Sequence, residues 1–200
     1  MELQEVFENA RSQKLKRGDV IYKMGDKPEN LYFLKEGLVG LVVWGESGRD
    51  HLVRLFKAGQ IFGHRSFFAQ EKYHASATVL QDTEILVLSK QEMRERMKGN
   101  CDLAEKLLET LARELRLSEQ RQVVLTEKDV TARIAEAVVY FKELHPTHSW
   151  TRQEIADFCG TTTPTVIRTL AKFVDDGLID QRGREIVILK KEELLAQGHL

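Results

Sequence analysis

The stretch TRQEIADFCGTTTPTVIRTLAKF, residues 151–173, predicts two short helices joined by a tight turn. Thr151 and the glutamate three residues later have the spacing of a capping box, which predicts that the first helix begins there. Gly160 permits a sharp turn. Thr163 and Pro164 are suited to the N-cap and the first position of a second helix. This order of elements is typical of a helix-turn-helix.

The second helix is predicted to have one apolar and one polar side. Val166, Leu170 and Phe173 recur at helical spacing and are expected to face inward. The residues left outward are short, polar or basic, and such residues can enter a major groove. They are Thr162, Thr165, Arg168, Thr169 and Lys172. Among them the arginine can donate two hydrogen bonds to a guanine edge.

Residues 180–190 predict a wing after the two helices. Two short strands flank Gly183, with Arg182 and Arg184 at the tip, where they can reach backbone phosphate. Threonines at the start of the second helix can hold phosphates there. The combination favours DNA binding over a helical hairpin with a solvated basic face. The candidate DNA-binding residues are Arg152, Thr161, Thr162, Thr163, Thr165, Arg168, Thr169, Lys172, Arg182 and Arg184.

The sequence before this segment is of a different character. Residues 14–90 contain evenly spaced apolar runs separated by glycines such as Gly37, which predicts short strands in a sandwich or closed barrel. From residue 89 onward the apolar spacing is helical. Its leucine stripe could pack within the chain or against a second copy of the helix, and both readings stay open. These leucines are Leu103, Leu107, Leu108, Leu111 and Leu115. A domain boundary is expected near residue 126, before a further helix that ends at Pro146.

Composition excludes several classes of protein. The 200 residues carry a formal net charge of −1, so anion binding must come from local clusters of charge. No apolar run reaches transmembrane length and the N-terminus lacks a signal-peptide core, so a cytoplasmic protein without membrane contact is expected. Two isolated cysteines, Cys101 and Cys159, give no metal-binding spacing.

Enzymatic activity is not expected. The sequence has no nucleophile–base pairing and no phosphate-binding glycine loop. His64 and His74 could be combined with Glu114 or Glu119, but no spacing in the sequence fixes the geometry of such a site.

At this point the chain resembles the CRP/FNR family of transcription regulators over nearly its whole length. The matching stretches are LKRGDVIYKMGDKPENLYFLKEGLVGLVV (15–43), GQIFGHRSFF (59–68), DVTARIAEAVV (129–139) and TRQEIADFCGTTTPTVIRTLAKFVDDGLI (151–179). The last of these is the most specific. The resemblance implies an α+β fold with an N-terminal antiparallel β-roll (double-stranded and jelly-roll-like), a long dimerisation helix and a C-terminal winged helix-turn-helix. It favours dimerisation through Leu108, Leu111 and Leu115.

The resemblance also implies domain boundaries and an effector pocket. The sensor domain would span 1–99, the dimerisation helix 100–125 and the DNA-binding domain 126–200. By family position the pocket would contain Gly63, His64, Arg65, Ser66, His74, Ala75, Ser118 and Glu119.

The pocket departs from the family members that bind cyclic AMP. Those members have a glutamate after the cassette glycine and an arginine–serine pair about ten residues later. Here His64 and the pair His74–Ala75 stand in those places. Histidine is only partly charged at neutral pH and lacks the fork of arginine. We therefore expect no cyclic AMP in the usual pose, while another small-molecule effector stays open. Haem with an axial ligand from His51, His64 or His74 is less favoured.

The recognition helix departs from the family as well. The glutamate that commonly accepts from cytosine falls at Pro164, while the family's arginine is kept as Arg168. The expected function is a homodimeric regulator that binds an inverted repeat in double-stranded DNA and meets RNA polymerase through the loop 145–150. The alternative is a cyclic-nucleotide-binding or haem-binding signalling module whose DNA binding depends on that effector.

Overall fold

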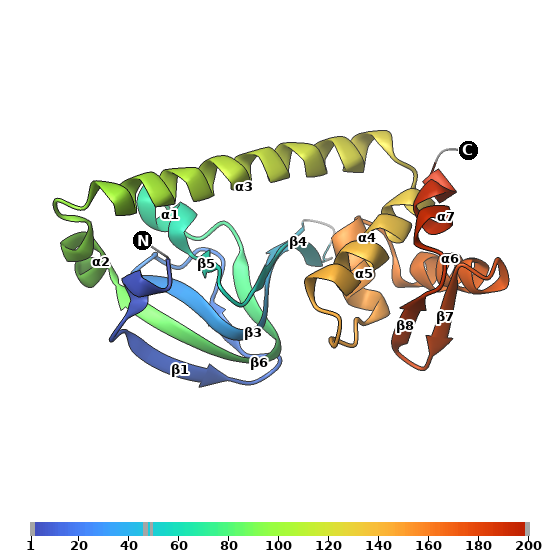
Figure 1. The fold of residues 1–200 in the computed structure, drawn as a ribbon, viewed down its shortest axis with the longest axis horizontal. Helices are drawn as coiled ribbons and strands as arrows, with labels where there is room; N and C mark the ends of the chain where they lie inside the picture. The colour runs from blue at the N-terminus through green and yellow to red at the C-terminus, as the bar shows by residue number, and fades with distance from the viewer. Residues whose placement is uncertain (1–2, 46–47, 49, 199–200) are drawn as a thin grey trace. The chain divides into compact units, whose positions relative to one another are not determined.

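The computed structural model describes residues 3–45, 48 and 50–198. The chain forms two compact units, Met1–Leu117 and Ser118–Leu200. An antiparallel sheet near the N-terminus, a long helix and C-terminal helices with a small hairpin confirm the predicted α+β fold (Figure 1). Across the described ranges, no helix is both long enough and apolar enough to cross a bilayer.

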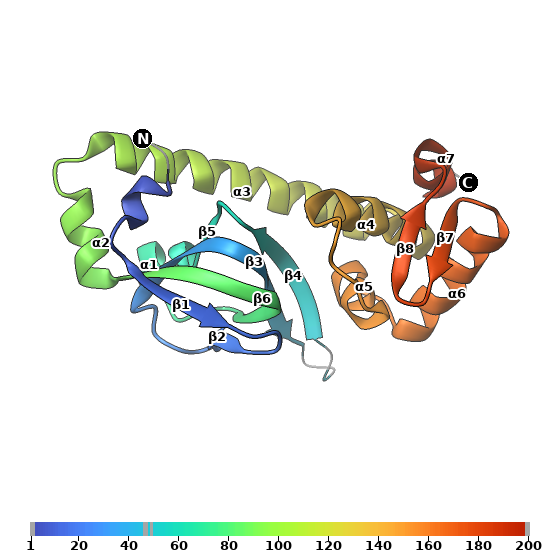
Figure 2. The same cartoon turned by 60° about the horizontal axis from the view of Figure 1, so that its bottom comes forward.

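The first unit is built around an antiparallel sheet. In the described residues it has six strands, and its main path runs β1-β6-β3-β4, while β2 pairs with β6 and β5 with β3 (Figure 2). The strands are β1 (Arg11–Leu15), β2 (Val20–Tyr22), β3 (Asn30–Trp44), β4 (Asp50–Lys57), β5 (Ile61–Phe62) and β6 (Ser76–Ser89).

Strand β3 is longer than the sequence predicted. Gly37 was expected to be a turn between two short strands, but β3 continues through it, paired with β6 on both sides. Gly37 has a φ of 96° and lies where the register shifts, which is the geometry of a bulge. A Cβ there would collide with Thr83 and with the carbonyl oxygen of Asp82. The glycine therefore bends a strand instead of ending it.

Helices cover one side of the first unit, where α1 lies beside α3 (Figures 1 and 2). Leu103 and Leu107 of α3 are buried with Phe7 and Met93, whereas Leu108 is 65% exposed. The helical elements are η1 (Glu5–Phe7), α1 (His64–Ala69), α2 (Lys90–Met97) and α3 (Cys101–Glu127), the last of which continues into the second unit.

The second unit packs helices against a two-stranded hairpin. Its core is formed by apolar residues that share helical spacing, including Ile134 and Val138 of α4. Helix α4 starts after the N-cap Asp129 and, as the sequence predicted, ends before Pro146. The elements are α4 (Val130–Leu144), α5 (Arg152–Cys159), α6 (Thr163–Asp175), β7 (Ile179–Arg182), β8 (Glu185–Ile188), α7 (Lys191–Leu195) and η2 (Ala196–Gly198).

Candidate nucleic-acid interface and sensor pocket

The start of α5 has the predicted capping box. The amide of Glu154 donates to the Thr151 hydroxyl at 3.1 Å, and the amide of Thr151 donates to the Glu154 carboxylate at 2.8 Å. The helix ends at Gly160, which has a φ of 62°, a conformation suited to glycine. These local signals fix the direction of α5 and the turn that follows it.

Helix α6 begins one residue earlier than predicted. Its N-cap is Thr162, whose hydroxyl accepts from the amide of Thr165 at 3.4 Å, so Pro164 occupies the second helical position. The hydroxyl of Thr163 donates instead to the side chain of Gln153 at 2.7 Å. The prediction of Thr163 as N-cap is wrong because both threonines can cap, and the extended backbone falls at Thr162.

Two half-buried arginines hold the C-terminal end of α5. Arg121 donates to the carbonyl of Phe158 at 2.7 Å, and its guanidinium lies 3.7 Å from the centre of that ring. Arg133 donates to the carbonyl of Cys159 at 3.0 Å. Cations at this end satisfy unpaired carbonyls and complement the helix dipole. Burial lowers the pKa of Arg121. Both arginines therefore hold α5, the first helix of the helix-turn-helix, in position.

Helix α6 presents one side to the core and the other to solvent. Val166, Leu170 and Phe173 are fully buried, as predicted. Arg168 and Lys172 are exposed, and Arg168 donates to the hydroxyl of Thr165 at 3.4 Å. The candidate threonines are half-buried: Thr161, Thr162, Thr163, Thr165 and Thr169.

The exposed side of α6 also carries apolar residues that sequence reasoning missed. Pro164, Ile167 and Ala171 are exposed, and Ile167 is 52% exposed. Their positions could have been found by extending the helical spacing around Arg168. The outward surface is therefore less polar than expected.

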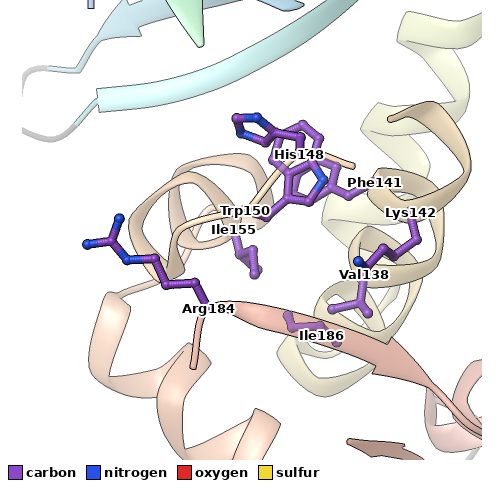
Figure 3. Close-up of a pocket in the computed structure, with 8 residues that line it drawn as sticks. All are labelled: Val138, Phe141, Lys142, His148, Trp150, Ile155, Arg184 and Ile186. Atoms are coloured by element: carbon purple, nitrogen blue, oxygen red, sulfur yellow. The ribbon is translucent and has the colours of Figure 1, made fainter. Parts of the chain in front are cut away.

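The three arginines in or next to the wing have different contacts. Arg152 of α5 donates to the carbonyl of Gly183 at 3.5 Å and is half-buried, which lowers its pKa, so it braces the wing. Arg182 pairs with Asp180 at 3.1 Å on the surface. Arg184 is exposed, has no ion-pair partner within the part of the chain described, and lies at the edge of a small pocket beside the wing (Figure 3).

An aromatic cluster lines the same small pocket as Arg184 and Ile186 of the wing (Figure 3). Trp150 stacks on Phe141 with ring centres 4.0 Å apart, and the edge of His148 meets Trp150 at 4.4 Å. The Nε2 atom of His148 is 3.5 Å from the Glu154 carboxylate. The loop 145–150 is thus anchored by buried residues, while Pro146, Thr147 and Ser149 are exposed.

In the first unit, six of the eight candidate pocket residues line one hollow. They are Gly63, His64, Arg65, Ser66, His74 and Ala75. Ser118 and Glu119 are exposed on α3 in the second unit. The hollow encloses about 260 Å³ of empty space, open solvent included, which is below the usual range for small-molecule sites.

Tyrosines fill much of the space beside this hollow. Tyr22 and Tyr73 stack with ring centres 3.6 Å apart, and both line it with Phe56. The Tyr73 hydroxyl donates to the carbonyl of Asn30 at 3.2 Å. Strand patterning can identify Tyr22 and Phe56 as core residues, but it gives no sign that they line a pocket together with Tyr73 of a loop.

Glu114 of α3 is a buried carboxylate that lies among two arginines and a histidine. It lies 2.7 Å from Arg54 of β4, 3.1 Å from His64 of α1 and 3.8 Å from Arg65. Burial raises the pKa of this carboxyl, but the hydrogen bond from His64 and the neighbouring positive charges outweigh it, so the pKa lies below its ordinary value. Glu114 falls on the helical phase of Leu103 and Leu107, the one sequence signal of its burial.

Two further titratable groups, His74 and Cys159, have simpler surroundings. Burial and the charge of Arg65 lower the pKa of His74, which disfavours the charged imidazole. Burial raises the pKa of the Cys159 thiol to about 12, so this cysteine is a poor thiolate. In the described ranges, no group of three or more potential metal ligands occurs.

Comparisons with known proteins cover both units. Residues 12–100 match the family described as "Cyclic nucleotide-binding domain" and residues 132–197 match the "Crp-like helix-turn-helix domain". An uncharacterized protein of Haemophilus influenzae is 37% identical over 106 residues, 53% of this chain and 82% of that protein.

Two further likenesses extend over most of the chain. The CRP-like cAMP-activated global transcriptional regulator of Mycobacterium tuberculosis is 27% identical over 187 residues, which cover 89% of this chain and 84% of that protein. The structure of FixK2 from Bradyrhizobium japonicum is similar with a TM-score of 0.82, covering 92% of this chain and 95% of that chain at 22% identity. At 22% sequence identity, this similarity shows that the two chains share a fold.

Proposed function

Because the chain belongs to the CRP/FNR family of transcription regulators, we propose that it is a homodimeric regulator that reads an inverted repeat in double-stranded DNA. Crp-like helix-turn-helix regulators bind DNA and act as dimers, and the family is one of regulators, not of enzymes. The observation that carries the proposal is α6, whose apolar side is fully buried while Arg168 projects from its exposed side.

Arg168 is the principal base reader in this proposal. Its guanidinium can donate two hydrogen bonds to the O6 and N7 atoms of a guanine in the major groove. Lys172 and the start of α6 lie on the same exposed surface and contact phosphates. The wing arginines Arg182 and Arg184 add phosphate contacts, while Arg152 acts by holding the wing.

The dimer is proposed to form through α3. Leu108 and Leu115 are exposed on the described chain and lie seven residues apart, with half-buried Leu111 between them. This spacing suits a two-stranded helical seam. Two recognition helices related by a twofold axis would meet half-sites about one helical turn apart. Residues 1–99 would serve as sensor, 100–125 as dimerisation helix and 126–200 as DNA-binding domain.

Replacing Arg168 tests the base reader. Arg168→Ala is expected to weaken binding to the preferred site by about 1–3 kcal/mol per half-site and to relax one base position. Arg184→Ala is the matched control, and it should weaken binding to all sequences and lower the salt dependence. Fluorescence anisotropy with site variants and a salt series measures both. If Arg168→Ala left the base preference intact, the assignment of α6 as base reader would fail.

The sensor domain is proposed not to bind cyclic AMP in the usual pose. No arginine stands at position 74, and burial together with the charge of Arg65 lowers the pKa of His74 and disfavours its charged form. Arg65 lies beside the Glu114 carboxylate, and stacked tyrosines narrow the hollow. The proposal includes a small-molecule effector other than cyclic AMP in that pose. Haem is disfavoured, because the Nε2 atom of His64 is already bonded to Glu114.

Calorimetric titration with cyclic AMP and cyclic GMP tests the sensor. The expected result is the absence of saturable heat at millimolar nucleotide. Saturable binding that also changes DNA affinity would favour the alternative, a module whose DNA binding depends on a cyclic nucleotide.

The setting of this activity is proposed to be the cytoplasm, where the target DNA lies. The exposed residues Pro146, Thr147 and Ser149 of the loop 145–150 form a surface for contact with RNA polymerase. The buried His148 and Trp150 anchor that loop to the second unit.

A further inference from the structure

The exposed side of α6 contains an apolar stripe next to its arginine. Pro164, Ile167 and Ala171 are spaced three and four residues apart, so they lie along one side of the helix. Ile167 is 52% exposed, although the isoleucine side chain is among those most often buried in proteins. The apolar surface of this stripe is therefore exposed to solvent in the described part of the chain.

The polar neighbours of the stripe are largely engaged within the chain. The hydroxyls of Thr162 and Thr165 lie 2.9 Å apart, and Thr163 donates to Gln153. Arg168 is the exposed cation beside Ile167. The surface that α6 offers to a partner thus combines one guanidinium with adjacent methyl and methylene groups.

We propose that Ile167 is a specificity-determining residue that packs on the 5-methyl group of a thymine next to the guanine read by Arg168. The inference rests on the proposed function, because it requires α6 to enter the major groove. In that groove the thymine methyl is the one apolar group that a base pair presents, and apolar side chains recognise it by contact. The exposed cations Arg168 and Lys172 beside the stripe match the charge of DNA better than an apolar protein surface.

Replacing thymine by deoxyuridine tests this contact, since it removes only the methyl group. The full-length protein is titrated with its selected duplex, in which each thymine of both half-sites is replaced in turn. For the wild type, one replacement is expected to weaken binding about fourfold per half-site, the effect of exposing one methyl group. For Ile167→Ala, the same replacement is expected to change affinity by less than about twofold, because the contact is already lost.

Val174→Ala is the matched control, since Val174 is also exposed on α6 but lies near its C-terminal end. This variant should keep the wild-type sensitivity to deoxyuridine, and thermal melting should show that both variants are folded. Equal deoxyuridine sensitivity in the wild type and Ile167→Ala would overturn the inference. So would wild-type indifference to every replacement, although tight binding to the selected site would still support the proposed function. Absence of any sequence-specific DNA binding would overturn both.

Discussion

The double substitution Leu108→Glu/Leu115→Glu is expected to convert the protein to a monomer and to abolish tight binding to its inverted repeat. Both leucines are more than 60% exposed in the isolated chain. Burying one leucine contributes about 1.5–3 kcal/mol. A dimer seam would bury four of them, so their loss should raise the dimer dissociation constant by at least about 10⁴-fold. The added carboxylates would repel one another across the seam.

DNA binding should fall with the dimer. A monomer can contact only one half-site at a time, so the affinity for the inverted repeat should approach that for nonspecific DNA, a loss of at least about 10³-fold. Sedimentation velocity measures the assembly state and fluorescence anisotropy measures DNA affinity. The matched control is Leu117→Glu, because Leu117 is 54% exposed on the same helix but on a different side. Dimers that persist in the double variant, or that dissociate equally in the control, would contradict the proposed seam.

Glu114→Ala is expected to destabilise the sensor unit by about 3 kcal/mol. The carboxylate is buried and is the shared ion-pair partner of Arg54, His64 and Arg65. Its removal leaves two arginines near each other without that partner. Hydrogen exchange of the β3 and β6 amides measures this unit separately, and it should become faster on the order of a hundredfold. The control Glu105→Ala changes an exposed glutamate of α3 and should have little effect.

The effect of Glu114 should depend on pH in a defined direction. Its folded-state pKa lies below the ordinary value of 4.5, so the unfolded chain binds more protons near that pH. The stabilisation is therefore complete above about pH 5 and is lost as the pH falls below 4.5. The difference in stability between the wild type and Glu114→Ala should shrink over that window. If the stability difference between the two proteins stayed constant down to pH 3, the charge of the Glu114 carboxylate would not be the source of the stabilisation.

Local signals predicted the helix-turn-helix well. The capping box at Thr151, the turn at Gly160 and the buried face of α6 each depend on residues within a few positions of one another. The start of α6 shifted by one residue because Thr162 and Thr163 can both cap a helix, and spacing does not decide between them.

Long-range features could not be predicted in the same way. Whether Gly37 ends a strand or bends it depends on Asp82 and Thr83, more than forty residues away. The Glu114 cluster joins β4, α1 and α3, and only the helical phase of Glu114 pointed to its burial. Ile167 was overlooked because only polar and basic residues were assigned to the outward side of α6, although its position follows from the same spacing that placed Arg168.

Selection of random duplex DNA by the purified, full-length protein without added ligand tests the central claim most directly. We predict enrichment of a twofold-symmetric site whose half-sites are about one helical turn apart. Each half-site should contain a guanine that the wild type prefers and that Arg168→Ala no longer prefers. Enrichment of an asymmetric single site, or no enrichment with and without cell metabolites, would contradict a dimeric regulator that reads DNA through α6.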